Sequence, residues 1–214
     1  MTLVANFTFN PFEENTYVLY DDTKECIIID PGCYTAAERK ILQDFIRDNE
    51  LKPVRLINTH CHLDHIFGNR FIADTYELGL EIHQGELPVL DAVPEICRRY
   101  GLPLPEASPQ PTRFIEAGEA ITFGNTHLQT LFTPGHSPAS ISFYCAESQF
   151  VIAGDVLFYG SIGRYDLTGG DLPTLLNSIR TQFFTLPDDV TVYPGHGPKT
   201  TIGFEKANNP FLQN

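Results

Sequence analysis

The sequence predicts an α/β protein built as a four-layer αββα sandwich, and three observations support that fold class. Short apolar stretches of strand length are followed by an apolar stripe at helical spacing, and this order occurs twice along the chain. Hydrophobic residues make up 42% of the 214 residues and charged residues 19%, which is enough apolar material for a substantial core. The chain has no short repeat and no low-complexity linker, so residues 1–214 are expected to form a single domain.

The first half opens with a predicted hairpin. Residues 16–20 and 25–29 are β-branched or aromatic, and the polar residues 21–24 between them are typical of a turn. Asp30-Pro31-Gly32 then ends the second strand. The elements expected next are a helix over 36–50, a strand over 54–58, a helix over 68–78 and a strand over 80–83. The apolar stripe of the first helix is Ile41, Leu42, Phe45 and Ile46.

Residues 84–112 interrupt this rhythm. The segment contains six prolines, a density that excludes a long helix or a central strand. It predicts a helical fragment followed by a surface loop. A loop of this length is either a lid or substrate wall, or a variable surface insertion.

The second half repeats the order of strands and then a helix. Residues 120–123, 128–133, 140–145 and 150–153 are predicted strands. Asp171 is expected to cap a helix, with Pro173 tolerated in the first turn. A short strand over 190–193 follows. The apolar face of the helix is Leu172, Leu175, Leu176, Ile179 and Phe183.

Charge and cysteine usage exclude several classes of protein. Lys and Arg number 14 and Asp and Glu number 27, giving a net charge of −13, which disfavours nucleic acid or an anionic membrane as a partner. No run reaches the roughly 20 apolar residues of a membrane span, and the first residues lack the pattern of a secretion signal. The five cysteines form no C-x-x-C pair, so neither a disulfide framework nor a thiolate zinc site is indicated. We therefore expect a cytoplasmic protein, and the sequence leaves its oligomeric state open.

The densest chemical signal is the run Thr59-His60-Cys61-His62-Leu63-Asp64-His65, directly after the predicted strand that ends at Asn58. In an extended segment His60 and His62 point to one side and Cys61 to the other, so Cys61 is expected to be structural. Imidazole and carboxylate groups are the natural ligands of zinc and of iron or manganese. The run therefore predicts a metal site.

Three further groups follow predicted strands. His136 and His196 each lie in a Pro-Gly-His turn, and Asp155 ends the strand between them. With His60, His62, Asp64 and His65 they make seven ligands, the number that two metals sharing one carboxylate require. His83 and His127 lie outside these contexts and are not expected to bind metal.

These motifs resemble the metallo-β-lactamase superfamily, and more closely the short bacterial members of its glyoxalase II-like (hydroxyacylglutathione hydrolase-like) branch. The likeness covers nearly the whole chain and implies the αββα metallo-β-lactamase fold. Full-length glyoxalase II enzymes continue into a helical region that binds glutathione, whereas 18 residues follow His196 here. The motifs that carry the resemblance are Asp30-Pro31-Gly32, Thr59 to His65, Pro134-Gly135-His136, Gly154-Asp155, Gly160 to Arg164 with Asp166, and Pro194 to Pro198.

The resemblance also implies a ligand assignment for two divalent metal ions, zinc first, with iron or manganese as alternatives. Asp155 would bridge the two ions. Asp64 would orient the metal-bound hydroxide as well as bind metal, and Asp30 would be an outer carboxylate that orients a ligand. One ion would be held by His60, His62 and His136, and the other by Asp64, His65 and His196.

The activity implied is metal-dependent hydrolysis of a small-molecule thioester or ester, by a hydroxide that bridges the two ions. Tyr165 is a candidate for the substrate-binding wall. Arg164 is expected to form an ion pair with Asp166 or Asp171.

Three other functions remain open at this stage. A mononuclear iron persulfide dioxygenase shares the fold, binds its iron with two His and one Asp, and would leave Asp64, His65 and His196 without metal. A nuclease of this fold would carry a basic surface, which the composition disfavours. A non-enzymatic metal-binding module would be expected to lose some of the seven ligands.

Overall fold

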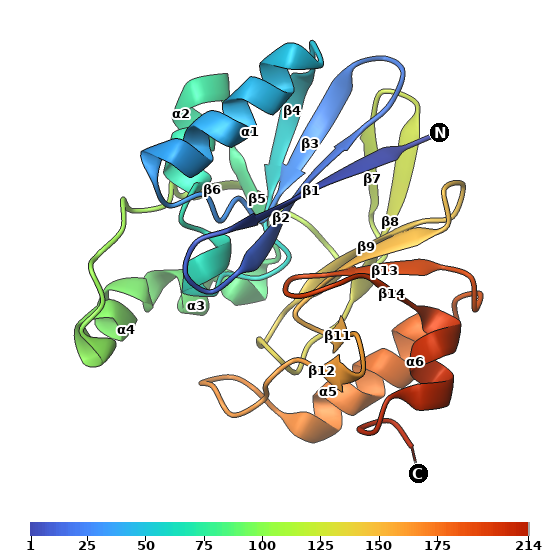
Figure 1. Cartoon of the computed structure of the whole chain (residues 1–214). Helices are drawn as coiled ribbons and strands as arrows, with labels where there is room; N and C mark the ends of the chain where they lie inside the picture. The colour runs from blue at the N-terminus through green and yellow to red at the C-terminus, as the bar shows by residue number, and fades with distance from the viewer. Residues whose placement is uncertain (214) are drawn as a thin grey trace. The chain divides into compact units, whose positions relative to one another are not determined.

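The computed structural model describes residues 1–213, which divide into two compact units. The N-terminal unit comprises Thr2–Ile115 with Phe123–Asn125, and the C-terminal unit comprises Glu116–Thr122 with the chain from Thr126 onward. Each unit contains one mixed sheet and its own helices (Figure 1). Among residues 1–213, no helix is long and apolar enough to cross a bilayer. The expectation of a single domain over 1–214 stays a prediction.

Within the described residues the sheet of the N-terminal unit has the order β1-β2-β3-β4-β5-β6. Strands β1 to β3 run antiparallel, and β3 to β6 run parallel. The predicted hairpin is confirmed, and β1 is an additional strand that was not predicted. Its side chains are mostly exposed or part-exposed, and the alternation of Ala5, Phe7 and Phe9 with Asn6 and Thr8 is the sequence signal that could have predicted it. The strands are β1 (Leu3–Phe9), β2 (Glu14–Tyr20), β3 (Glu25–Ile29), β4 (Lys52–Ile57), β5 (Leu80–Ile82) and β6 (Pro111–Phe114).

Helices α1 (Ala36–Asp48) and α2 (Asn69–Tyr76) cover one face of this sheet (Figure 1). Leu42 and Ile46 of α1 and Ile72 of α2 belong to the same buried cluster as the sheet residues Ile28 and Leu56. The apolar stripe predicted for α1 is wrong at one position. The side chain of Ile41 is 52% exposed, because its position lies outside the helix face that Leu42 and Ile46 bury.

The proline-rich segment folds as predicted, into short helices followed by a loop. Helices α3 (Leu87–Asp91) and α4 (Val93–Tyr100) each have a proline in the first turn, where the missing N–H removes no hydrogen bond. The loop then leads to β6, which forms the edge of the sheet. An edge strand accommodates Pro111.

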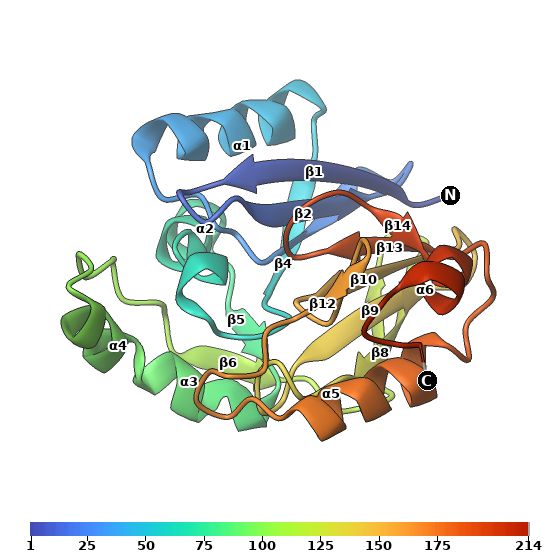
Figure 2. The ribbon, with the colours of Figure 1, turned by 60° about the horizontal axis from the view of Figure 1, so that its bottom comes forward.

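The sheet of the C-terminal unit has the order β14-β13-β10-β9-β8-β7 within the described chain, with β10 and β13 parallel. Leu175, Ile179 and Phe183 pack with Val151 and Val192 of the sheet. Figure 2 shows the helix that begins at Leu172 on one face of this sheet. The strands are β7 (Ala120–Phe123), β8 (Thr126–Phe132), β9 (Ile141–Cys145), β10 (Phe150–Gly154), β13 (Thr191–Pro194) and β14 (Thr200–Thr201), with a separate hairpin of β11 (Leu157–Phe158) and β12 (Ser161–Ile162).

The helix predicted after Asp171 is α5 (Leu172–Ser178), which continues as a π-helical segment, Ile179–Phe183. The Asp171 carboxylate accepts a hydrogen bond of 2.9 Å from the Thr174 N–H, which confirms the predicted cap. A last helix, α6 (Ile202–Asn208), was not predicted. It is capped by Thr201 and has few apolar residues, so it carries little helical periodicity.

Candidate metal centre

The ligand run of the N-terminal unit begins two residues after β4 and bends into a 3-10 turn, Leu63–His65. His60 and His65 are fully buried, whereas His62 and Asp64 are partly exposed. The ring centroid of His60 lies 4.8 Å from that of His62 and 4.1 Å from that of His65. Nε2 of His65 is 3.7 Å from Oδ2 of Asp64. The turn therefore brings the three imidazoles and the carboxylate of this run together.

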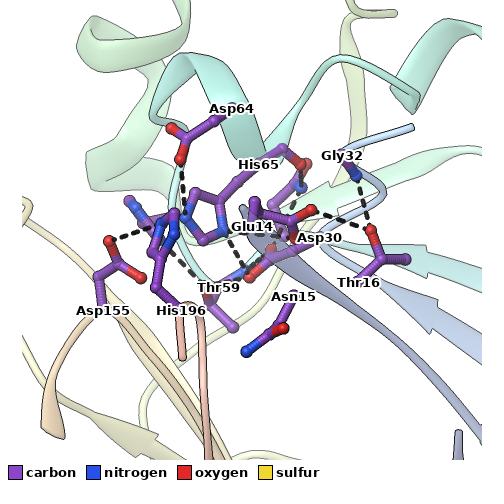
Figure 3. A network of polar contacts seen from close by, with 12 residues as sticks. Glu14, Asn15, Thr16, Asp30, Gly32, Thr59, Asp64, His65, Asp155 and His196 are labelled. Carbon is purple, nitrogen blue, oxygen red and sulfur yellow. Dashed lines mark hydrogen bonds and ion pairs between the residues drawn. The ribbon is translucent and has the colours of Figure 1, made fainter. Parts of the chain in front are cut away.

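The carboxylate of Asp30 lies beside Thr59 and His65 of this run, as Figure 3 shows. Its backbone has a positive φ of 49°, an uncommon conformation outside glycine, and its carboxylate is buried. Oδ1 accepts the Thr59 N–H at 2.7 Å, and Oδ2 accepts the Thr59 hydroxyl at 2.6 Å and lies 3.2 Å from Nδ1 of His65. The Thr59 hydroxyl oxygen is also 3.0 Å from Nδ1 of His60. These are the contacts that an orienting outer carboxylate requires.

The hydrogen bond to Asp30 also fixes which nitrogen of His65 faces the ligand cluster. An ionised carboxylate only accepts, so Nδ1 of neutral His65 carries the proton and Nε2 presents a lone pair. Nε2 is the nitrogen on the side of Asp64. Metal-bound histidines commonly have this arrangement.

Sequence reasoning missed two buried glutamates around the run. Oε1 of Glu14 lies 3.9 Å from Nδ1 of His65. Complete burial raises the pKa of Glu14 well above its ordinary value, while the nearby His65 lowers it. Oε2 of Glu86 accepts the Cys61 N–H at 2.9 Å. A buried glutamate is rare, and neither residue stands in a motif, so no local sequence signal marks them.

Cys61 is buried, as its expected structural role requires. Burial raises the pKa of the Cys61 thiol well above its ordinary value, which disfavours the thiolate that would compete for a metal.

In the C-terminal unit the three predicted ligands follow three different strands. His136 lies after β8, Asp155 directly after β10, and His196 two residues after β13. Nε2 of His136 is 3.4 Å from Oδ2 of Asp155, and Nε2 of His196 is 3.5 Å from the same oxygen, the second contact appearing in Figure 3. The sheet therefore brings together two imidazoles and one carboxylate, although His136 and His196 are 60 residues apart in sequence.

Backbone groups hold His136 and the turn before His196 in place. Nδ1 of His136 lies 2.7 Å from the carbonyl oxygen of Arg164, which only accepts, so Nδ1 donates and Nε2 presents a lone pair toward Asp155. The Gly195 N–H donates to the Gly154 carbonyl oxygen at 2.8 Å, which ties the turn before His196 to the end of β10. Gly135 has a φ of 127°, and a Cβ there would overlap the backbone of Leu175.

The donor atoms of both sets fit divalent metal ions. Around Asp155, Nε2 of His136 and Nε2 of His196 lie within 3.5 Å of one carboxylate oxygen. The lone pair of His136 Nε2 faces that oxygen at 3.4 Å, an arrangement that is repulsive unless a proton or a cation lies between them. Imidazole nitrogen with carboxylate oxygen is the donor set of zinc, iron and manganese sites. His60, His65 and His136 each have Nδ1 close to a fixed hydroxyl, carboxylate or carbonyl oxygen.

Comparison with known families identifies the chain. Residues 10–196 match the family model of the metallo-beta-lactamase superfamily. The chain belongs to the metallo-β-lactamase superfamily. It is accordingly a metal-dependent hydrolase of that superfamily, and the candidate ligands of both units lie inside the matched residues.

Two curated relatives of this superfamily member have nearly the same length. The probable metallo-hydrolase YqgX of Bacillus subtilis is 39% identical over 94% of this chain and 93% of the relative. The hydroxyacylglutathione hydrolase GloC of Haemophilus influenzae is 38% identical with the same coverage. The likeness to the glyoxalase II-like branch is therefore confirmed.

Two solved structures are similar over the whole chain. That of the BLEG-1 B3 metallo-beta-lactamase has a TM-score of 0.90 and 36% identity, covering 99% of this chain and 100% of that one. That of TTHA1623 in a di-iron-bound form has a TM-score of 0.86 and 35% identity, covering 98% of this chain and 100% of that one. The predicted metallo-β-lactamase fold is thereby confirmed.

The remaining candidates of this metallo-β-lactamase family member have plainer surroundings. Arg164 forms the predicted ion pair with Asp166, at 2.9 Å from Nε to Oδ1. Tyr165 is 40% exposed, and its role at a substrate wall stays a prediction. Nδ1 of His83 accepts the Gly85 N–H at 3.1 Å, and His127 is exposed on β8. Neither histidine belongs to a potential metal-binding group within residues 1–213.

Proposed function

We propose that this protein hydrolyses small-molecule thioesters with two divalent metal ions, zinc first and iron or manganese as alternatives. The relative named hydroxyacylglutathione hydrolase, 38% identical over nearly the full length, supports the substrate class. The di-iron-bound form of a structure 35% identical to this chain supports a count of two ions. We propose, as part of the same function, that the protein acts in the cytoplasm on a small molecule.

The ligand assignment follows the order of motifs in the family. His60, His62 and His136 are proposed for one ion, and Asp64, His65 and His196 for the other. Asp155 is proposed as the bridge, because its Oδ2 is near Nε2 of two histidines at once.

The observation that carries the proposal is the fixed orientation of two of the histidines, His65 and His136. Nδ1 of His65 and Nδ1 of His136 each face an oxygen that can only accept, so the lone pair of each ring belongs to Nε2. A cluster of surface or core histidines has no reason to share that orientation.

When bound, two divalent cations polarise a carbonyl group and lower the pKa of water from 15.7 toward roughly 7. The chain contributes position and charge. Asp64, whose side chain is partly exposed, is proposed to orient the attacking water, while Asp30 holds the ring of His65 in place. Because water is the nucleophile, no serine or cysteine of the chain is required.

The test is metal analysis of the purified protein combined with activity assays on the same sample. We expect close to two ions per chain and hydrolysis of thioesters, which is measured as the free thiol that the reaction releases. Removal of the metal by a chelator should abolish the activity, and readdition should restore it.

Two results would overturn the proposal. One reproducible iron per chain, with oxygen uptake on addition of glutathione persulfide and no thioester hydrolysis, would make the protein a persulfide dioxygenase. Opening of a β-lactam ring much faster than any thioester is cleaved would place it with the lactamases, to one of which it is 36% identical.

A further inference from the structure

The hairpin of β11 and β12, together with the two residues that follow it, lies against all three proposed ligands of the C-terminal unit. The ring centroid of Phe158 is 6.3 Å from that of His196, in an edge-to-face arrangement. Gly163 comes directly after β12. A Cβ at Gly163 would overlap the Asp155 carbonyl oxygen and would lie 3.2 Å from Cβ of His136.

The end of this segment carries the hydrogen-bond acceptor of His136. The Gly163 N–H donates to the Val156 carbonyl oxygen at 3.2 Å, which closes the hairpin just before Arg164. The Arg164 carbonyl oxygen lies 2.7 Å from Nδ1 of His136. The place of that oxygen depends on the hairpin, so the groups that hold the hairpin also set the orientation of the His136 ring.

A buried carboxylate from another element holds the turn of the hairpin. Glu205 of α6 is fully buried, and its two oxygens accept the Gly160 N–H at 3.1 and 3.2 Å. Oε1 also accepts the Thr200 hydroxyl at 2.6 Å, and Oε2 accepts Nδ2 of Asn209 at 2.7 Å. Among the described residues, the carboxylate is thus satisfied by hydrogen-bond donors and forms no ion pair with a basic side chain.

Two further contacts join the hairpin to α6. Asn209, which is also buried, uses one proton of Nδ2 for Glu205 and the other for the Ser161 carbonyl oxygen at 2.9 Å. The ring of Tyr159 stacks on that of Phe204, with centroids 4.8 Å apart. The consecutive residues 159–161 of the hairpin therefore all rest on α6 or on the residue after it.

The hairpin depends on these contacts. Strands β11 and β12 have two residues each and form a separate two-stranded sheet, and such a hairpin is marginally stable at best on its own. A buried carboxylate is costly unless hydrogen bonds satisfy it, and one of the donors to Glu205 is the turn of the hairpin itself. The carboxylate and the hairpin therefore stabilise each other.

We propose that Glu205 and Asn209 are positioning residues of the metal centre. They fix the hairpin and, through it, the Arg164 carbonyl oxygen that holds Nδ1 of His136. The inference rests on the proposed function, because His136 is a ligand only in that assignment. Both side chains bond the backbone of the hairpin, so they act on the ring of His136 through that backbone.

The test follows the proton on Nδ1 of His136 in the metal-free protein. The hydrogen bond to the Arg164 carbonyl oxygen shields this proton from exchange with water, and NMR measures the exchange rate. Glu205→Gln keeps the shape of the side chain, but either orientation of its amide turns an NH2 group toward the Gly160 N–H. We expect exchange to become about tenfold faster, the effect of losing one hydrogen bond to a charged group.

Zinc affinity gives a second readout. Competition with a chromogenic chelator should show a fall of about tenfold in Glu205→Gln, the lower end of the effect of a lost outer partner. Lys206→Gln is the matched control, because it introduces the same residue at the next position of α6 and removes an ion pair with Asp188 that does not involve the hairpin. It should change neither quantity by more than about twofold.

Asn209→Ala tests the second contact and leaves the carboxylate in place, so it decides the question if Glu205→Gln does not fold. It removes one hydrogen bond to the hairpin, and the Nδ1 proton of His136 should exchange about threefold faster. Asn208→Ala is its control, because Asn208 is exposed and its amide donates to the Phe204 carbonyl oxygen within α6.

The backbone amides of β9 show whether a variant loosens the whole unit. Faster exchange of the Nδ1 proton with unchanged β9 amides, absent from both controls, supports the proposal. Exchange that stays at the wild-type rate in the folded variants, or that rises only as much as exchange of the β9 amides, overturns it. Wild-type protein that binds no metal or cleaves no thioester would overturn the proposed function instead. The two failures are distinguishable, because the exchange measurement needs neither metal nor substrate.

Discussion

The proposed metal ligands of the N-terminal unit and those of the C-terminal unit differ in their spacing along the chain and in the groups that hold them. His60 to His65 form one run, positioned by side chains from several elements, among them Asp30 and Thr59. His136, Asp155 and His196 are far apart in sequence, and main-chain groups position His136 and the turn before His196.

This difference indicates which substitutions should disturb each set of proposed ligands. A side chain that orients a ligand is removed by one substitution, whereas a carbonyl oxygen remains whatever residue carries it. The C-terminal set should therefore tolerate changes at neighbouring side chains, and should fail when the backbone itself cannot adopt its turn. The N-terminal set should behave in the opposite way.

The largest effect is expected from Asp155, whose carboxylate lies near both His136 and His196. Asp155→Asn preserves the shape and removes the charge, so we expect loss of at least one metal ion and a fall in hydrolysis of more than about a hundredfold, exceeding the usual effect of an outer partner. Circular dichroism should show the fold retained. Asp189→Asn, an exposed change in the same unit, is the control. An Asp155→Asn protein that keeps full metal content and activity would refute the bridging role.

The backbone support of His136 can be broken at Gly135. An alanine there must adopt a φ of 127° and would overlap Leu175, so Gly135→Ala should lower the free energy of unfolding by about 3 kcal/mol. Gly160→Ala is the control, because that site has a φ of 63° and open space around it, and it should cost only about 1 kcal/mol. Urea unfolding measures both. Equal costs would show that the close approach at Gly135 is unimportant.

The contrast between side-chain and backbone support is tested directly by a pair of variants. Asp30→Asn removes the charge that holds the protonated Nδ1 of His65, and metal affinity should fall by about 10- to 100-fold. Arg164→Ala leaves the carbonyl oxygen that holds His136, so affinity should change by less than about twofold, below the effect of a lost outer partner. Competition with a chromogenic chelator measures both values. Similar losses in the two variants would contradict the comparison.

The smallest effect concerns Glu38, whose carboxylate caps α1 and accepts the Asn10 N–H at 2.7 Å. Asn10 in turn donates to the Asp64 carbonyl oxygen. Partial burial alone would raise the pKa of Glu38, but hydrogen bonds from Thr35, Asn10 and Tyr34 outweigh it, so the pKa lies below the ordinary 4.5. Ionised Glu38 therefore stabilises the fold above about pH 4.5, and this contribution is lost as the pH falls through the lower folded value.

Glu38→Gln should accordingly cost about 1 kcal/mol of unfolding free energy at neutral pH and less in acid below the folded pKa. Urea unfolding at the two pH values measures the difference. Glu147→Gln, at an exposed position of the C-terminal unit, should show no such dependence. A cost for Glu38→Gln that is the same at both pH values would exclude the ionised carboxylate as the stabilising group.

The sequence predicted the features that repeat at a fixed spacing or form a dense motif. The hairpin of β2 and β3, the buried face of α5 and the ligand run after β4 belong to this class. His136 and His196 were found because the Pro-Gly-His turn occurs twice. Strand β1 was missed although Ala5, Phe7 and Phe9 alternate with Asn6 and Thr8, a period of two that is typical of a strand.

The outer groups of the centre could not be predicted in the same way. Glu14 and Glu86 are charged residues in apolar surroundings, and only the fold shows that each lies beside the ligand run. The Arg164 carbonyl oxygen that orients His136 belongs to the backbone, so no residue type at that position could signal it.

The buried cysteines allow the rate of local unfolding to be measured separately in each of the two units. Cys26, Cys33, Cys61 and Cys97 lie in the N-terminal unit, whereas Cys145 lies on β9 of the C-terminal unit. Burial raises the pKa of Cys26 and of Cys33 to about 12, so neither offers a reactive thiolate until its surroundings open. Timed alkylation followed by peptide mass spectrometry would therefore give one opening rate from Cys145 and another from the remaining four thiols.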